Sequence, residues 1–212
     1  MERREKIFGV TCPKCNHKFE ENLPTAIFST GDENESIKAG DFAGLTCPSC
    51  GNEFILNYRF AYTDEINQFM IVNDPAFVDR KARLAFSTSL GLIGAARKNE
   101  LIKHTLRITC NYDMLREKIA ILEAGLDDKI VELMKHFLIN SEDFAYKASD
   151  IKEMTYKADG KFYLTTHLNV GLSLDFSDVL YNTIANNYSE FLKKDMEILV
   201  DRAWAEKFLA QG

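Results

Sequence analysis

Two pairs of cysteines carry the clearest chemical signal in this sequence. Residues 11–19 read TCPKCNHKF and residues 46–54 read TCPSCGNEF, so each segment has Thr-Cys-Pro-x-Cys and a phenylalanine four residues later. Two thiolates separated by two residues can bind the same metal ion from one tight turn. The spacing therefore predicts one structural zinc ion per chain, held by four ligands: Cys12, Cys15, Cys47 and Cys50.

The other residues of the two segments fit such turns. A proline follows the first cysteine of each pair and fixes φ there. The residue after the second cysteine often needs a positive φ, and it is Asn16 in one segment and Gly51 in the other, the types that tolerate it best. Four thiolates leave zinc no open position, so we expect the metal not to activate water.

Two other interpretations of the cysteine pairs are a redox-active Cys-x-x-Cys and unligated buried thiols. A redox pair usually sits at a helix start after a strand, whereas both segments here lead into polar, strand-like sequence. His17 lies beside the first pair, but four cysteines already complete a shell, and we expect His17 to be exposed. The total of five cysteines is an odd number, which is unsuited to a disulfide framework.

Composition narrows the class of protein. The chain has 26 Lys and Arg against 32 Asp and Glu, a net charge of -6, with the two signs mixed along the sequence. Binding to nucleic acid or anionic membrane depends on clustered cations, so neither is favoured. No stretch approaches the roughly 20 apolar residues of a membrane span, and the N-terminus lacks the apolar run of a secretory signal. We therefore expect a cytoplasmic protein.

The elements around the cysteines predict a zinc ribbon with antiparallel strands. Residues 25–30 read as a short strand, and the polar run at 31–36 reads as an exposed loop. Residues 53–62 and 68–73 read as two further strands, which we expect to extend the sheet of the ribbon.

A helical region follows. Asp74 and Pro75 are typical of a helix start, which predicts a helix over 76–90, whereas 91–100 is ambiguous and 101–110 resembles a strand. Apolar residues then recur at helical spacing: Leu115, Ile119, Leu122, Leu126, Ile130, Leu133 and Phe137.

Residues at the start and in the middle of this apolar stripe carry further helix signals. Asn111 or Asp113 can cap its start. The stripe indicates one continuous helix, while Gly125 followed by Asp127 favours two helices, the second capped by Asp127.

The C-terminal part predicts a β-hairpin and two helices. Residues 150–176 alternate around Asp159-Gly160, a strong hairpin signal, with Phe162, Leu164, Thr166 and Leu168 expected on one face. A turn at 169–171 precedes another strand, Ser177 caps a helix to about 192, and a last helix covers 195–209. The whole chain is thus predicted to be α+β.

Three regions follow from this order of elements. We expect the zinc ribbon with its strand pair at 8–74, the helical part at 75–140 and a C-terminal α+β unit at 141–212.

The sequence resembles the CpXC domain family, named for two Cys-Pro-x-Cys motifs. The segment IKAGDFAGLTCPSCGNEFILNYRFAYTDEINQFMIV at 37–72 is similar to the second knuckle of the family and the strand pair after it. NYDMLREKIAILEAGLDDKIVELMKHFL at 111–138 is similar to the helical end of the family. The resemblance covers about 8–138, less clearly at 76–110. It implies the same four cysteine ligands and no particular activity; Asn16 departs from the usual glycine.

Few other residues suggest chemistry. Cys110 could act as a nucleophile with His104, His136 or His167, but a single cysteine ending an apolar strand is more often buried and inert. His136 near a helix end and His167 on a strand both suit structural roles. The acidic pair Asp127-Asp128 suits a helix N-terminus better than a catalytic site.

Two functional hypotheses remain. The first is a zinc-stabilised interaction module whose partner is a protein or a second copy of the chain, with nucleic acid less favoured. The second is an enzyme with its site in an inter-domain cleft and zinc as scaffold only. No Walker loop, dinucleotide glycine pattern, His-Glu-x-x-His or Gly-x-Ser-x-Gly supports the enzyme. Four aromatic residues after the second knuckle are expected in the core rather than on a binding face: Tyr58, Phe60, Tyr62 and Phe69.

Overall fold

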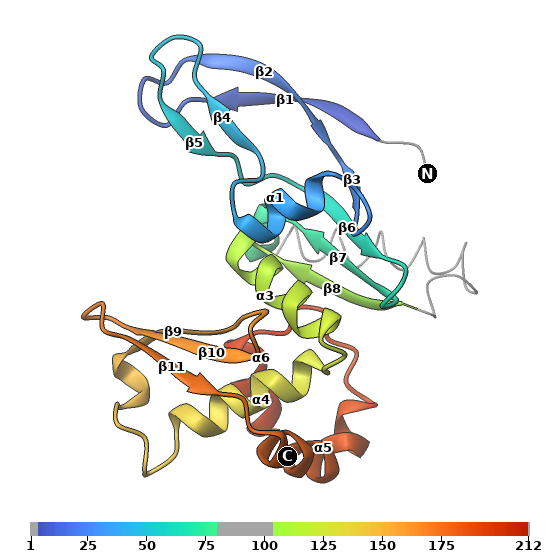
Figure 1. Cartoon of the computed structure of the whole chain (residues 1–212), viewed down its shortest axis with the longest axis vertical. Helices are drawn as coiled ribbons and strands as arrows, with labels where there is room; N and C mark the ends of the chain where they lie inside the picture. Colours follow the sequence, from blue (N-terminus) through green and yellow to red (C-terminus); the bar gives the residue numbers. More distant parts are fainter. Residues whose placement is uncertain (1–3, 80–103, 212) are drawn as a thin grey trace. The chain divides into compact units, whose positions relative to one another are not determined.

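The computed structural model describes residues 4–79 and 104–211 of the chain (Figure 1). It divides the chain into two compact units, Met1–Arg116 and Glu117–Gly212. Helices and antiparallel strands occur in both units, so the predicted α+β class is confirmed. Among the described residues, no helix combines the length and apolar character that crossing a membrane requires.

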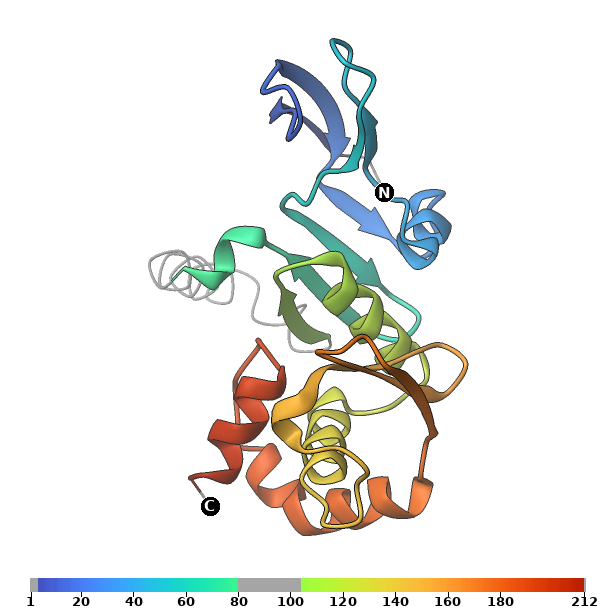
Figure 2. The ribbon, with the colours of Figure 1, turned by 90° about the vertical axis from the view of Figure 1, so that its left-hand side faces the viewer.

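Two small antiparallel hairpins form one end of the first unit, and both figures of the whole chain show them side by side (Figures 1 and 2). The first joins β1 (Glu5–Thr11) to β2 (Lys18–Pro24), and the second joins β4 (Gly44–Thr46) to β5 (Glu53–Ile55). The rings of Phe19 and Phe54 meet edge to face, with 6.5 Å between their centroids. These two phenylalanines of the repeated motif therefore join one hairpin to the other.

A separate four-stranded sheet follows, in the order β3-β6-β7-β8. Its strands are β3 (Ala26–Phe28), β6 (Phe60–Asp64), β7 (Phe69–Asn73) and β8 (Thr105–Thr109). The outer pairs, β3 with β6 and β7 with β8, are parallel, and the central pair is antiparallel.

The predicted single strand at 53–62, extending the sheet of the ribbon, is wrong. The two ends of this segment lie in different sheets, because β5 pairs with β4 whereas β6 pairs with β3 and β7. The four aromatic residues named above are at most 5% exposed, which confirms them as core.

The predicted exposed loop at 31–36 is also wrong, because helix α1 spans Glu33–Ala39. Acidic residues in its first turn suit the positive end of the helix dipole, and Gly40 closes it with φ 89°. Ile37 is buried, and Asn34 accepts a hydrogen bond of 2.7 Å from the Tyr62 hydroxyl. One apolar and one amide side chain therefore attach this polar segment to the sheet.

The predicted helix start at Asp74 is confirmed for a short 3-10 helix, η1 (Pro75–Val78), whose Ala76 N–H donates to the Asp74 carboxylate at 3.0 Å. Most of the helix predicted over 76–90, and all of the ambiguous 91–100, lie outside the described residues. Within the described part of 101–110, β8 confirms the expected strand.

The apolar stripe lies on two helices, as predicted from Gly125 and the cap at Asp127, and not on one continuous helix. Helix α3 (Tyr112–Glu123) begins in the first unit, with Asn111 accepting from Met114 N–H at 2.9 Å, and ends in the second. Gly125 follows with φ 71°, and Asp127 caps α4 (Asp128–Ile139) by accepting from Lys129 N–H at 2.9 Å.

The second unit contains a three-stranded antiparallel sheet in the order β11-β10-β9. After a 3-10 turn, η3 (Ala148–Asp150), come β9 (Ile151–Tyr156), β10 (Lys161–Thr166) and β11 (Gly171–Asp175). The predicted Asp159-Gly160 turn is confirmed, with Gly160 at φ 77°. The prediction for Leu168 is wrong: it is 87% exposed, because β10 ends at Thr166.

Two more helices complete this unit. Helix α5 (Asp178–Leu192) is capped by Ser177 as predicted, and α6 spans Arg202–Leu209. The predicted start of the last helix at 195 is wrong, because Asp195 bonds to Lys129 and Asp201 instead provides the cap. Helix α4 packs against both α5 and α6 (Figure 2). The fully buried core includes Val131, Leu133, Met134, Phe162, Leu164, Val200 and Ala205.

Candidate metal centre

Equivalent turns of the two hairpins carry the four paired cysteines. Cys12 and Cys15 lie between β1 and β2, and Cys47 and Cys50 lie between β4 and β5. The strand pairs close in the same register, Thr11 opposite Lys18 and Thr46 opposite Glu53. The repeated sequence motif therefore folds into a repeated local structure.

Backbone hydrogen bonds shape both turns in the same way. Cys12 N–H donates to His17 O and Asn16 N–H donates to Cys12 O, at 2.9 and 3.0 Å. In the second turn, Cys47 bonds with Asn52 and Gly51 in the same pattern, both at 2.9 Å. Asn16 has φ 60° and Gly51 has φ 67°, so the predicted positive φ is confirmed in both turns.

The four sulfur atoms form one compact cluster. All lie within 4.8 Å of one another, and two of the pairs cross between the hairpins: Cys12 with Cys50 at 3.8 Å and Cys15 with Cys47 at 3.7 Å. A tetrahedral shell with metal–sulfur bonds of about 2.3 Å separates its sulfurs by about 3.8 Å. The cluster therefore has the size that a four-thiolate metal ion requires.

The electrostatics of the cluster also suit a cation. Burial opposes ionisation of Cys12, but the N–H groups of Cys15 and Lys14 favour the thiolate and lower the pKa of Cys12 to about 6. The N–H of His17 favours the thiolate of Cys15, yet the adjacent sulfur of Cys50 raises the pKa of Cys15 to about 12. A cation between the sulfurs would favour the thiolate form of Cys15 against this effect of its neighbour.

The side chains differ in exposure. Cys12 and Cys47 are buried, while Cys15 and Cys50 are exposed. His17 is exposed, as predicted, and its ring stacks on Phe19 with 6.3 Å between the centroids. Among the described residues, the metal-sized cluster contains the four paired cysteines and not Cys110, which is partly buried just after β8.

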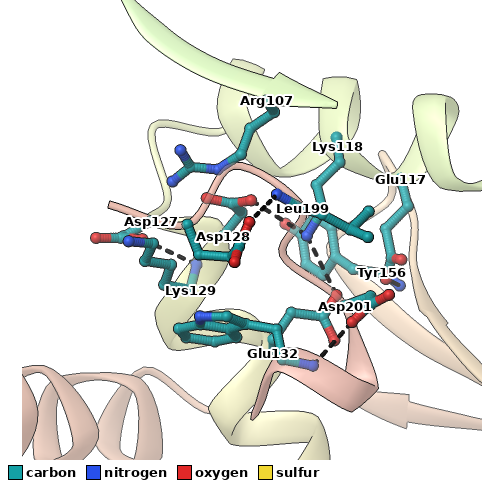
Figure 3. A network of polar contacts seen from close by, with 12 residues as sticks. Arg107, Glu117, Lys118, Asp127, Asp128, Lys129, Glu132, Tyr156, Leu199 and Asp201 are labelled. Carbon is teal, nitrogen blue, oxygen red and sulfur yellow. Dashed lines mark hydrogen bonds and ion pairs between the residues drawn. The ribbon is translucent and has the colours of Figure 1, made fainter. Parts of the chain in front are cut away.

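Asp127 and Asp128, the acidic pair at the start of α4, have different structural roles. Asp127 caps the helix, whereas Asp128 is fully buried and its carboxylate lies 3.1 Å from the ammonium of Lys118 (Figure 3). His136 lies in the last turn of α4, where a cation suits the helix dipole. The sequence pattern did not reveal the burial of Asp128, because charged residues in an amphipathic helix are ordinarily assigned to solvent.

The two hairpin turns bring together four thiols that could hold a metal ion, and they precede the four-stranded sheet in the chain. The family model described as CpXC protein matches residues 10–135, more than half of the chain. The chain therefore belongs to the CpXC family, and the resemblance seen in its sequence is confirmed. No curated protein matches the chain, and no solved structure does.

Proposed function

We propose that the chain is a zinc-stabilised interaction module, with one structural Zn²⁺ bound by the thiolates of Cys12, Cys15, Cys47 and Cys50. The observation that carries the proposal is the four-sulfur cluster, because its spacing agrees with a tetrahedral thiolate shell. Zinc is the common divalent ion for such a shell, with iron as the other metal of this geometry.

A bound Zn²⁺ would supply folding energy to the hairpins. Each hairpin has only two strands, and an isolated two-stranded hairpin is marginally stable in water. The contact between Phe19 and Phe54 adds one aromatic pair between the hairpins, worth about 1 kcal/mol. We therefore expect metal binding to be the main contribution to the stability of the two hairpins.

Cobalt substitution tests the ligand set. Co²⁺ added to the metal-free protein should give the visible and near-ultraviolet bands of tetrahedral thiolate coordination at one ion per chain, and Zn²⁺ should displace it. Cys15→Ser should remove the four-thiolate spectrum. Cys110→Ser is the matched control and should leave it unchanged, because Cys110 is outside the cluster. Identical spectra for the two variants would contradict the proposed ligands.

A metal ion with four thiolate ligands has no open position for substrate or water. We therefore assign the site a structural role, in which the metal orders a surface that binds a partner. Apolar side chains lie exposed on the hairpins, with Ile7 62% and Ile55 50% exposed. Within the described residues, each hairpin is a two-stranded sheet whose outer edges pair with no further strand. Exposed apolar side chains next to such edges favour a protein partner, and the first partner to test is a second copy of the chain.

Sedimentation velocity over a range of protein concentrations tests this part. Ile55→Lys should weaken self-association while the cobalt spectrum stays intact. Lys14→Ala is a control on the same pair of hairpins, because it changes the charge of an exposed side chain and removes no exposed apolar one. If the wild-type protein is monomeric at all concentrations, a second copy is excluded as the partner. If the protein associates but Ile55→Lys has no effect, the interface does not include Ile55.

A further inference from the structure

The four sulfurs of the candidate metal centre differ in their access to solvent. The two outer sulfurs belong to Cys15 and Cys50, which are exposed. The two inner sulfurs belong to Cys12 and Cys47, which are 0% and 1% exposed. Oxidation of cysteine follows thiolate character and exposure, so a reagent that arrives from solvent meets the outer sulfurs first.

Each outer sulfur lies next to the inner sulfur of the other hairpin. The sulfur of Cys15 is 3.7 Å from that of Cys47, and the sulfur of Cys50 is 3.8 Å from that of Cys12. Both contacts connect the turn between β1 and β2 to the turn between β4 and β5. Each sulfur that solvent reaches therefore has a buried sulfur at contact distance.

We propose that hydroperoxides oxidise the outer sulfurs, and that the site releases its metal as two disulfides form across the hairpins. The expected disulfides join Cys15 to Cys47 and Cys50 to Cys12. The inference rests on the proposed Zn²⁺ site and adds a reversible, oxidised state to it.

The reaction balances with hydrogen peroxide as the oxidant. The thiolate of an outer cysteine attacks one peroxide oxygen, the O–O bond breaks, hydroxide leaves, and the sulfur becomes a sulfenic acid. The inner thiolate then attacks this sulfur, so an S–S bond forms, the S–O bond breaks and a second hydroxide leaves. Each disulfide thus takes two electrons from two thiolates and reduces one peroxide to two hydroxide ions, which the buffer protonates.

Disulfides and a four-thiolate metal shell exclude each other. Bonded sulfurs lie about 2.0 Å apart, whereas the sulfurs of the tetrahedral shell lie about 3.8 Å apart. The first disulfide removes two of the four charged ligands and the second removes the others, so no thiolate remains to hold the ion.

The turns favour pairing across the hairpins over pairing within one hairpin. Movement of one hairpin against the other can bring the contacting sulfurs together. A disulfide between Cys12 and Cys15 must instead form inside a turn that hydrogen bonds of 2.9 and 3.0 Å already close. Crossed disulfides also keep a covalent link between the hairpins, which the reduced, metal-free chain lacks. The oxidised chain should therefore unfold at a higher temperature than the reduced, metal-free chain.

Titration of the zinc-loaded full chain with hydrogen peroxide, in buffer without reductant, tests the inference. Elemental analysis comes first, so that a chain without zinc counts against the proposed function and not against the oxidation. Release is then followed with a coloured chelator that by itself leaves the site loaded. We expect loss of the one zinc per chain, and its rebinding after treatment with dithiothreitol.

Mass spectrometry identifies the sulfurs that react. Dimedone, which traps sulfenic acids, should label Cys15 and Cys50 early in the reaction, and digestion without reductant should give the two crossed disulfides. Cys110→Ser is the matched control and should release zinc as the wild type does, because Cys110 lies outside the cluster. Zinc retained in excess peroxide, early label mainly on the inner sulfurs, or disulfides within each turn would each overturn the inference.

Discussion

Substitution of Leu133 by alanine should destabilise the second unit strongly. Leu133 lies on α4, is fully buried and belongs to the core that includes Phe162 and Trp204. Full burial of a leucine side chain contributes about 1.5–3 kcal/mol, and the cavity left by truncation increases the loss to about 2–5 kcal/mol. With a urea dependence of about 1–3 kcal/mol per molar, the unfolding midpoint should fall by roughly 1–3 M.

The same substitution at Leu168 is the matched control. Leu168 follows β10 and is 87% exposed, so Leu168→Ala should change the free energy of unfolding by no more than about 0.5 kcal/mol. Trp204 fluorescence measures both variants, since the indole is 6% exposed and its ring stacks on Phe208. Equal midpoint shifts for the two variants would refute the placement of α4 in the core of this unit.

Three further predictions concern single contacts. Tyr62→Phe should cost about 1–3 kcal/mol in the first unit, measured by thermal unfolding, because the buried side chain of Asn34 loses its 2.7 Å hydrogen bond. Gly51→Ala should weaken metal binding by about 1–2 kcal/mol, measured by competition with a chelator, because Gly51 has φ 67°, which strains a residue with a side chain. Gly9→Ala is the control and should bind metal as the wild type does, because Gly9 needs no positive φ and an added Cβ there meets no atom. Asp127→Ala should destabilise α4 by about 0.5–2 kcal/mol in urea unfolding, and no loss would show that the Lys129 N–H does not need the cap.

The local elements with strong signals could be predicted from the sequence. The repeated Thr-Cys-Pro-x-Cys motif indicated both knuckles, and Asn16 and Gly51 indicated their positive φ. The Asp159-Gly160 turn and the caps at Asp127 and Ser177 were likewise readable, because each depends on residues close together in the chain.

The features that sequence reasoning missed depend on distant contacts. Helix α1 has few apolar residues, and its order depends on Ile37 and on the bond from Tyr62 to Asn34. The parallel pairing of β7 with β8 joins segments separated by more than 30 residues, which no local pattern encodes. The burial of Lys118 and Glu132 results from packing α3 against α4, while a periodic pattern of apolar residues assigns charged side chains to solvent.

Elemental analysis of protein purified without added metal tests most directly whether Cys12, Cys15, Cys47 and Cys50 bind one structural zinc ion. We predict one zinc per chain, retained in Cys110→Ser and lost in Cys15→Ser, with a large drop in thermal stability of the wild type on chelation. Protein that contains no metal, with its paired cysteines free or joined in disulfides and with thermal stability unchanged by a chelator, would contradict the account.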